Sequence, residues 1–460
     1  MSATHWCLLR TNFSVERHLP ASRESRDKRC LDERCLYCKP EGRMNPRVLS
    51  APSPERLQFA QIRTVLLCAF IALMDGFDIQ AMAVVTPQLL DIWHMKAGEF
   101  APVLSASFAG IMLGTILLGQ AGDRLGRRKV ILFAFTVVGL ASIATALATR
   151  VEIMMVLRFV TGFAIGGCLP NVTALTAEAL PARFTGRAVT AMYCFVPLGG
   201  MLGGVAGSQL IERFDWQAVF IIGGVLPLIT LLALLRWLPE SSTVADSHRV
   251  DSRLLLGRPQ LTRQVRALFQ PRLRRASTLL WMTFFCSMAS TYLLSSWLPT
   301  LFKAAGRTLP DAIHMMSLFQ FGGVLGGLLL GYLVDRGWIR SLPMSFVIGG
   351  CMSMLIAWMN QASVYLSAVV VLAGAGVIGS QLCINALCAR LYPETLRASG
   401  IGWALGIGRS GAIASPYLGG LAVSSSSGWE SVFIAAAALT LLCGLSTAML
   451  AATRTGQPMD

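Results

Sequence analysis

Long apolar segments separated by short polar or charged clusters dominate this chain. Uncharged stretches at 130–149, 188–211 and 431–453 are each long enough to cross a membrane as one helix, since about 20 helical residues span the roughly 30 Å hydrocarbon core. The pattern predicts about twelve membrane-spanning helices. They are expected to begin near Ile62, Phe100, Val130, Glu152, Ala188, Gln217, Ala276, Asp311, Leu342, Ser363, Ser399 and Glu430.

Composition excludes a soluble domain. Hydrophobic residues make up 54% of the chain and charged residues only 14%, with a mean hydropathy of +0.60, whereas charged residues form about a quarter of a typical soluble domain.

The chain also matches itself at one fixed offset of 212 residues. The dipeptide Asp123-Arg124 recurs as Asp335-Arg336. The same offset relates Pro87 to Pro299, Gly110 and Gly114 to Gly322 and Gly326, Gly162 and Gly167 to Gly374 and Gly379, and Pro181 to Pro393. Parallel repeats in a hydrophobic chain are typical of transporters.

We therefore predict an all-α integral membrane protein built from two parallel six-helix repeats. The expected bundles are residues 61–238 and 276–452, joined by a cytoplasmic linker at 239–275. Short cytoplasmic tails are expected at 1–60 and 453–460.

The positions of Lys and Arg predict the orientation, because positively charged loops stay in the cytoplasm. One alternate set of loops is rich in them, including 124–129 and 249–275. The other set holds only Lys96, Arg150, Arg213, Lys303 and Arg307. Both termini are therefore expected to be cytoplasmic. This asymmetry and the basic tail account for most of the net charge of +15, so no nucleic-acid partner is expected.

The N-terminal tail carries Cys30, Cys35 and Cys38, with His18 upstream. A zinc knuckle is conceivable, but a well-placed fourth ligand is missing and the Arg- and Ser-rich composition favours disorder. We expect no metal and no cofactor. Met44 is an alternative start, which would leave residues 1–43 untranslated. The remaining cysteines are scattered through the chain and imply no disulfide framework.

Two acids in the first predicted span need a functional reason, because a charge in the membrane centre costs about 2.5–3.5 kcal/mol. Asp75 and Asp78 are three residues apart and share a helix face, and Gly76 between them allows another helix to approach closely. Two such carboxylates resist ionising together, so we expect the pair to accept protons. The alternative is a capping or packing role in a broken helix.

Two arginines also lie in predicted spans. Arg409 is near mid-depth in the eleventh span, where a fixed cation needs an anion. That anion is either a first-span aspartate or a carboxylate substrate, and we favour the substrate. Arg158 lies near the outer end of the fourth span. Snorkelling to the interface and a role in substrate binding or coupling are both open for it.

Other polar or aromatic side chains are candidates for lining a substrate cavity, although each has helix packing as an alternative. They are Tyr193, Tyr292, Ser295, Trp297, Gln320, Gln381 and Asn385.

The loop Gly122–Lys129 resembles the signature loop of the major facilitator superfamily, and Asp335-Arg336 resembles its echo in the second half. Carboxylates and arginines at opposed helix ends suit a gate that forms ion pairs in one state and breaks them in another. A simple cytoplasmic anchor is the alternative. The gating residues expected on this basis are Asp123, Arg124, Arg127, Arg128, Glu178, Asp335 and Arg336.

Within that superfamily the chain resembles the aromatic acid:proton symporter family. The resemblance covers about residues 60–452 and rests on the first-span string 75–78, the fourth-span string 158–171 and the strings 196–200, 223–228, 238–241 and 408–412. It implies that Asp75 and Asp78 carry proton coupling and substrate transport, and that Asp123 and Asp335 are needed for the conformational cycle.

The function expected is proton-coupled import of small aromatic carboxylates by a monomer in a bacterial-type inner membrane. Its partners are then the carboxylate, protons and the lipid bilayer. The alternatives are an importer of sugars or aliphatic acids, a drug-efflux antiporter, or a sensor on a transporter fold. An enzyme is not expected, because no nucleophile and base are grouped in the spans.

Overall fold

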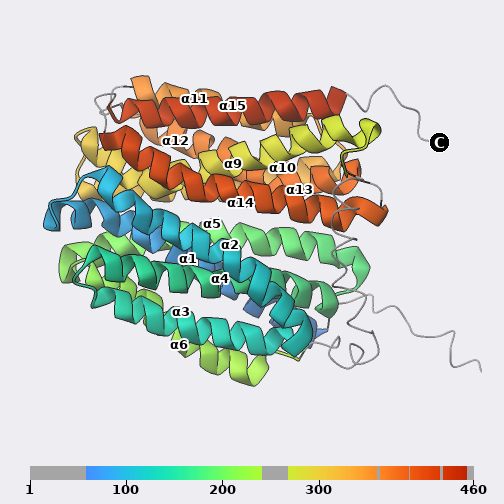
Figure 1. The fold of residues 1–460 in the computed structure, drawn as a ribbon, viewed down its shortest axis with the longest axis horizontal. Helices are drawn as coiled ribbons and strands as arrows, with labels where there is room; N and C mark the ends of the chain where they lie inside the picture. Colours follow the sequence, from blue (N-terminus) through green and yellow to red (C-terminus); the bar gives the residue numbers. More distant parts are fainter. Residues whose placement is uncertain (1–57, 241–267, 360–362, 393, 425–427, 453–460) are drawn as a thin grey trace, which may run out of the picture. The chain divides into compact units, whose positions relative to one another are not determined.

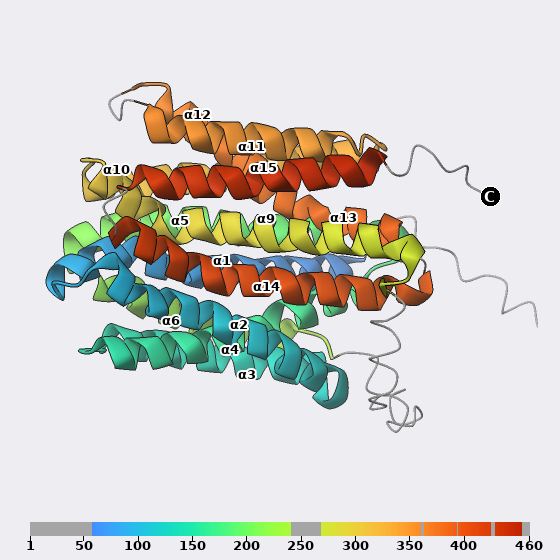
Figure 2. The same ribbon diagram turned by 45° about the horizontal axis from the view of Figure 1, so that its top comes forward.

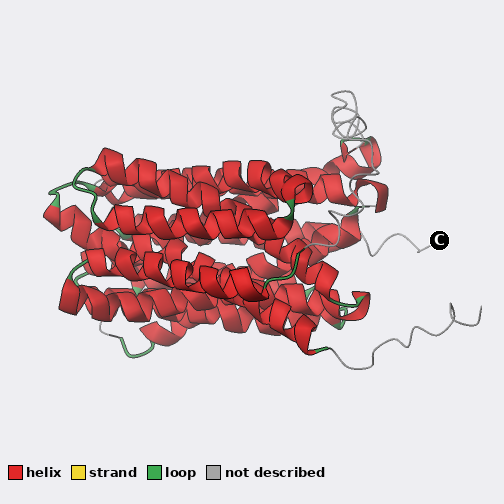
Figure 3. Ribbon diagram, turned by 90° about the horizontal axis from the view of Figure 1, so that it is seen from below, coloured by secondary structure: helices red, strands yellow, loops and turns green. Residues whose placement is uncertain are grey.

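The computed structural model describes residues 58–240, 268–359, 363–392, 394–424 and 428–452. Every regular element in these ranges is a helix (Figure 3). The elements of the first half are α1 (Phe59–Ile92), α2 (Ala97–Leu125), α3 (Arg127–Ala146), α4 (Val151–Ala179), α5 (Ala182–Phe214) and α6 (Gln217–Trp237). Those of the second half are α9 (Pro271–Ala304), α10 (Leu309–Asp335), α11 (Ser341–Trp358), α12 (Leu366–Gly374), the π-helical η3 (Ala375–Gly379), α13 (Ser380–Leu391), α14 (Glu394–Ser424) and α15 (Glu430–Ala452).

The helices confirm the predicted class and number of spans. Eleven helices of the described ranges are long and apolar enough to cross a membrane, one of them formed by α12, η3 and the start of α13. The other long helix is α14, of 31 residues, which carries Arg409 and several glycines and serines. Their starts lie close to the expected ones, and the largest difference is α5, expected near Ala188 and observed from Ala182. The first half occupies the lower part of Figure 1 and the second half the upper part.

Residues that correspond between the two repeats make corresponding contacts within each repeat. A Cβ atom at Gly114 of α2 would lie 1.9 Å from the carbonyl oxygen of Phe163 in α4. At the same offset in the second half, a Cβ atom at Gly326 of α10 would lie 2.3 Å from the carbonyl oxygen of Ala375 in η3. These recurring glycines of α2 and α10 are thus points where corresponding helices touch backbone to backbone.

The spans place their turns at two ends of the bundle. The arginine-rich end holds the α2–α3 turn at Gly126 and the α10–α11 turn at Gly337, whose φ values of 102° and 87° require glycine. The arginine-poor end holds the α1–α2 turn at His94 and the α9–α10 turn at Gly306.

Polar contacts between described residues join the two halves at the arginine-poor end. Lys303 of α9 forms an ion pair with Asp91 of α1, and its Nζ also donates to the carbonyl oxygen of Pro87 at 3.2 Å. The backbone N–H of Gly98 donates to Ser424 Oγ of α14 at 2.7 Å. Within the described ranges, the other hydrogen bond between the halves lies deeper and joins Gln80 Nε2 to the carbonyl oxygen of Ser295 at 3.4 Å. The contacts of Lys303 and Gly98 thus join the two halves at the arginine-poor end.

The outer faces of the bundle keep large apolar side chains exposed, as contact with lipid requires. Leu140, Leu232 and Leu329 are 59%, 67% and 60% exposed. The predicted N-terminal tail, most of the linker and the C-terminal tail lie outside the described residues, together with Cys30, Cys35, Cys38 and His18.

Candidate functional site

The first helix carries both of its aspartates into the interior of the protein. Asp75 is 4% exposed and Asp78 is 5% exposed. A Cβ atom at Gly76 would lie 1.9 Å from the carbonyl oxygen of Val196, so α5 crosses α1 directly between the two acids. The expectation that Gly76 permits a close helix approach is confirmed.

Asp78 is held by a cation and a hydroxyl from two other helices. Arg158 Nη1 of α4 lies 3.4 Å from Asp78 Oδ2, and Ser142 Oγ of α3 donates to Asp78 Oδ1 at 2.9 Å. Arg158 Nη2 also donates to Thr145 Oγ1 at 3.0 Å and to Thr161 Oγ1 at 3.1 Å. Asp78 is therefore one member of a buried, hydrogen-bonded ion pair.

Arg158 does not snorkel, so that interpretation was wrong. Its side chain is 1% exposed, and its guanidinium carbon lies 4.9 Å from the centre of the Phe220 ring of α6. Position along α4 suggested an interfacial residue, but α1, α3 and α6 surround this turn of the helix and exclude both water and lipid.

Asp75 has a different environment from Asp78. Both of its carboxylate oxygens are buried without a hydrogen-bond donor in the described part of the chain. The charges of Arg409, from α14 in the other half, and of Asp78 both act on this carboxyl group. Arg409 is half-buried, and no carboxylate of the described residues lies within ion-pair distance of it. A buried acid and a half-buried cation without an ion-pair partner in the described ranges thus act on each other from opposite halves.

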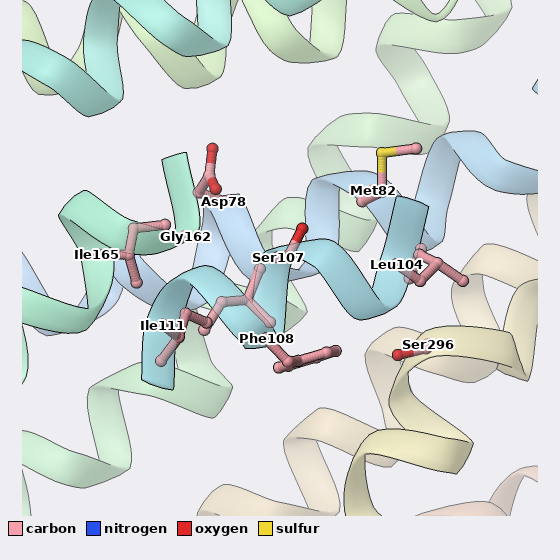
Figure 4. A pocket seen from close by; sticks show the side chains of 11 residues that line it. Asp78, Met82, Leu104, Ser107, Phe108, Ile111, Gly162, Ile165 and Ser296 are labelled. Carbon is pink, nitrogen blue, oxygen red and sulfur yellow. The ribbon is translucent and has the colours of Figure 1, made fainter. Parts of the chain in front are cut away.

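A small cavity adjoins Asp78 between the two halves (Figure 4). Its volume is about 20 Å³, enough for one water molecule but not for a substrate ring. Phe108 of α2 lines it, and the Phe108 ring lies 4.5 Å from the Tyr292 ring of α9, centre to centre. This aromatic pair joins the two halves beside the buried acids.

The other residues predicted to line a substrate cavity lie on several helices. Gln320 is buried at the α5–α10 contact, where its Nε2 would lie 2.9 Å from a Cβ atom at Gly200. Tyr193 is half-buried in α5, and its hydroxyl accepts from Thr173 Oγ1 at 3.2 Å. Gln381 is half-buried in α13. The side chain of Asn385 lies outside the described part of the structure.

Trp297 is a packing residue in this conformation. It is 0% exposed, and its Nε1 donates to the carbonyl oxygen of Pro416 at 2.9 Å. A Cβ atom at Gly419 of α14 would lie 2.8 Å from the indole ring, and one at Gly420 would lie 2.9 Å from it. The ring therefore packs α9 against α14 and does not line the small cavity, which agrees with the helix-packing alternative in this conformation.

Sequence reasoning missed the neutral side chains around Arg158 and the cavity. Ser142, Thr145 and Thr161 are uncharged residues within apolar helices, and Phe108 and Phe220 look like ordinary span residues. The only signal of the serine and the two threonines was a hydroxyl group deep in a span, which is also common as a helix-packing group. The two phenylalanines gave no signal.

The expected gating residues are joined in the first half. Arg127 forms ion pairs with Glu178 of α4 and, at 3.4 Å, with Asp123 of α2. Arg128 Nη2 donates to the carbonyl oxygen of Leu235 at 2.6 Å, and its Nη1 lies 3.4 Å from Glu240. These contacts connect the ends of α2, α3, α4 and α6.

The corresponding loop of the second half is built differently. Arg336 lies over the Tyr332 ring, 4.4 Å from its centre, and Asp335 is exposed. Arg124 of the first half is also exposed. The difference follows from the sequence, because Gly337, Trp338 and Ile339 replace the Leu-Gly-Arg of the first loop.

The profile of the Major Facilitator Superfamily matches residues 68–416. The chain belongs to this superfamily. It is 35% identical over 411 residues to the 4-hydroxybenzoate transporter PcaK of Pseudomonas aeruginosa, covering 84% of this chain and 91% of that protein. It is 34% identical to the 3-(3-hydroxy-phenyl)propionate transporter of Escherichia coli, covering 88% and 98%. The resemblance to the aromatic acid transporters of the major facilitator superfamily is confirmed, and so is the expectation of a transporter and not an enzyme.

Solved structures of the superfamily share the fold. The nucleoside transporter NupG superposes with a TM-score of 0.66 at 15% identity, covering 85% of this chain and 99% of that one.

Proposed function

We propose that this major facilitator protein imports small aromatic carboxylates together with protons by alternating access. The names of its relatives support the substrate class, since they are transporters of hydroxybenzoate and hydroxyphenylpropionate. The Lys and Arg distribution supports a bacterial-type inner membrane location with the arginine-rich end, and hence both termini, in the cytoplasm.

The observation that carries the proposal is the unequal environment of the two buried acids. Asp78 has its countercharge in Arg158, whereas the carboxylate of Asp75 has no hydrogen-bond donor in the described part of the chain. A buried carboxylate without a donor is costly, and protonation removes the charge. Asp75 is therefore the proton carrier, and the Asp78–Arg158 pair is the fixed support beside it.

Arg409 is the better substrate anchor of the two arginines. The guanidinium of Arg158 already forms an ion pair with Asp78 and hydrogen bonds to two threonines. Arg409 has no ion-pair partner in the described ranges. When Asp75 takes a proton, the negative charge that acts on Arg409 disappears. The guanidinium is then free to bind a substrate carboxylate bidentately.

The cycle couples these two events to rocking of the halves. In the outward-facing state Asp75 is protonated and the substrate carboxylate binds Arg409, so that the buried charges balance. The arginine-poor end then closes through contacts such as the Asp91–Lys303 ion pair and the Gly98–Ser424 hydrogen bond of this structure. With that end closed, the substrate site opens toward the cytoplasm. Release of the proton from Asp75 then displaces the substrate from Arg409.

The energetics of this coupling limit how far the substrate can accumulate. One proton with one monovalent anion carries no net charge, so only the pH gradient and the substrate gradient do work. Each pH unit is worth about 1.4 kcal/mol, or roughly tenfold accumulation.

The test is uptake by proteoliposomes of hydroxybenzoates, phenylpropionates, an aliphatic acid and a sugar, with and without an imposed pH gradient. Accumulation of aromatic acids only when the outside is more acidic supports the proposal. Accumulation of the sugar or aliphatic acid, or accumulation without any gradient, contradicts it.

Replacing Arg409 by lysine is expected to raise the apparent KM for aromatic carboxylates about tenfold or more, because lysine keeps the charge but loses the bidentate fork. Initial uptake rates over a concentration series measure the change. An unchanged KM would place the carboxylate site elsewhere.

Tyr292 is expected to contact the substrate ring, because its own ring contacts that of Phe108 across the halves, and Phe108 lines the cavity beside Asp78. Tyr292→Leu should raise KM several-fold for aromatic acids, while Tyr292→Phe should retain most of the affinity. Equal KM values for the parent and Tyr292→Leu would exclude ring stacking at this position.

A further inference from the structure

The outer surface of α11 forms a ridge on the side of the second half that faces away from the first half (Figures 1 and 2). Arg340, Met344 and Ile348 follow one another at four-residue spacing along this ridge, so they share one helix face. Met344 is 64% exposed and Ile348 is 47% exposed. Arg340 caps the ridge at the arginine-rich end, where α11 begins.

Two apolar grooves flank the ridge. The groove toward α10 and α12 has a volume of about 810 Å³ and includes Leu329, Leu333 and Leu372 in its walls. The groove toward α15 has a volume of about 730 Å³ and includes Leu445 and Ala448. Both grooves end at Arg340, and both are in the size range of ligand sites.

The net charge at the Arg340 end of the ridge is positive. Arg340 is exposed, and no carboxylate in the described ranges lies within ion-pair distance of it. Arg336 adds a second exposed cation on the same turn and Asp335 one opposing charge. Trp338, 66% exposed on this turn, is the type of residue that marks the membrane–water interface.

The dimensions fit one leaflet. Arg340 and Ile348 are about 12 Å apart along the helix axis at 1.5 Å per residue, and one leaflet contributes about 15 Å of hydrocarbon. A ligand that fits this surface has an anionic head group for Arg340 and two apolar chains, one for each groove. A water-soluble anion would use the arginine but leave both grooves unfilled.

We propose that an anionic phospholipid of the leaflet at the arginine-rich end binds across α11, with its phosphate at Arg340 and one acyl chain in each groove. The site is separate from the buried acids and does not depend on which substrate the protein carries.

The experiment compares binding of phosphatidylglycerol and phosphatidylcholine to the delipidated full-length protein in detergent, by native mass spectrometry over a lipid concentration series. The parent is expected to prefer phosphatidylglycerol. Arg340→Gln should weaken phosphatidylglycerol binding roughly fivefold and remove that preference, since each basic residue near an anionic head group is worth about 1 kcal/mol. Arg236→Gln, an equal charge change at an exposed arginine of the same end outside both grooves, should retain it.

The acyl chains are tested separately. Ala448→Phe fills the groove beside α15 and should weaken binding of both lipids, whereas Ala438→Phe, at an exposed site of the same helix outside that groove, should not. Glycerol phosphate, the head group without chains, should not compete. An unchanged preference in Arg340→Gln, unchanged binding in Ala448→Phe, or competition by glycerol phosphate would each overturn the proposal.

Discussion

Asp75→Asn is expected to abolish accumulation driven by a pH gradient, while substrate exchange across the membrane continues. Asparagine has nearly the shape of a protonated aspartate and cannot release a proton, so the carrier stays in its proton-loaded form. Because the carboxylate oxygens of Asp75 have no hydrogen-bond partner in the described ranges, the substitution breaks no hydrogen bond there. The variant should therefore fold as well as the parent.

The measurement has two readouts in the same proteoliposomes. Net accumulation under an imposed gradient should fall to background, and exchange of labelled for unlabelled substrate should stay within a few-fold of the parent. Asp75→Glu is the control, since it keeps the titratable group. Gradient-driven accumulation in Asp75→Asn equal to that of the parent would remove Asp75 from the coupling mechanism.

Arg158→Gln is expected to destabilise the protein by about 3–5 kcal/mol, because it leaves the Asp78 carboxylate buried without its countercharge. The loss should appear as a large drop in the unfolding temperature of the purified protein and as loss of transport. Thr145→Val, which removes one hydrogen bond to the same guanidinium, should cost only about 1 kcal/mol.

A second substitution separates the ion pair from the arginine itself. Asp78→Asn in the Arg158→Gln background removes the remaining buried charge and should restore most of the lost stability. If the double variant were as unstable as Arg158→Gln, the destabilisation would come from the packing of Arg158 against Phe220 and not from an unpaired charge.

The sequence predicted the fold because its signals are local or periodic. Apolar segments of membrane length gave the spans, and the offset that joins Gly114 to Gly326 marked helix contacts that recur in both halves. A glycine between two acids was enough to predict the close approach at Gly76.

The site was predicted less completely, because the hydrogen-bond and ion-pair partners of a buried side chain come from neighbouring helices that are distant in the sequence. The spacing of Asp75 and Asp78 predicted one shared acidic site, but α3 and α4 supply a hydroxyl and a guanidinium to Asp78 alone. Depth along α4 left Arg158 open between an interfacial residue and a role in substrate binding or coupling, and the packing of α1, α3 and α6 around it buries the side chain. Trp297 is likewise placed by a neighbouring helix, since α14 covers its ring in this conformation.

The central claim is that aromatic carboxylate and proton cross together through a site in which Asp75 carries the proton. It is tested most directly by adding an aromatic acid outside proteoliposomes that contain a pH-sensitive dye, with equal pH on both sides and the membrane potential clamped at zero. The account predicts that an inward substrate gradient acidifies the interior with the parent protein and not with Asp75→Asn. Substrate uptake by the parent without acidification beyond that of protein-free vesicles would contradict it.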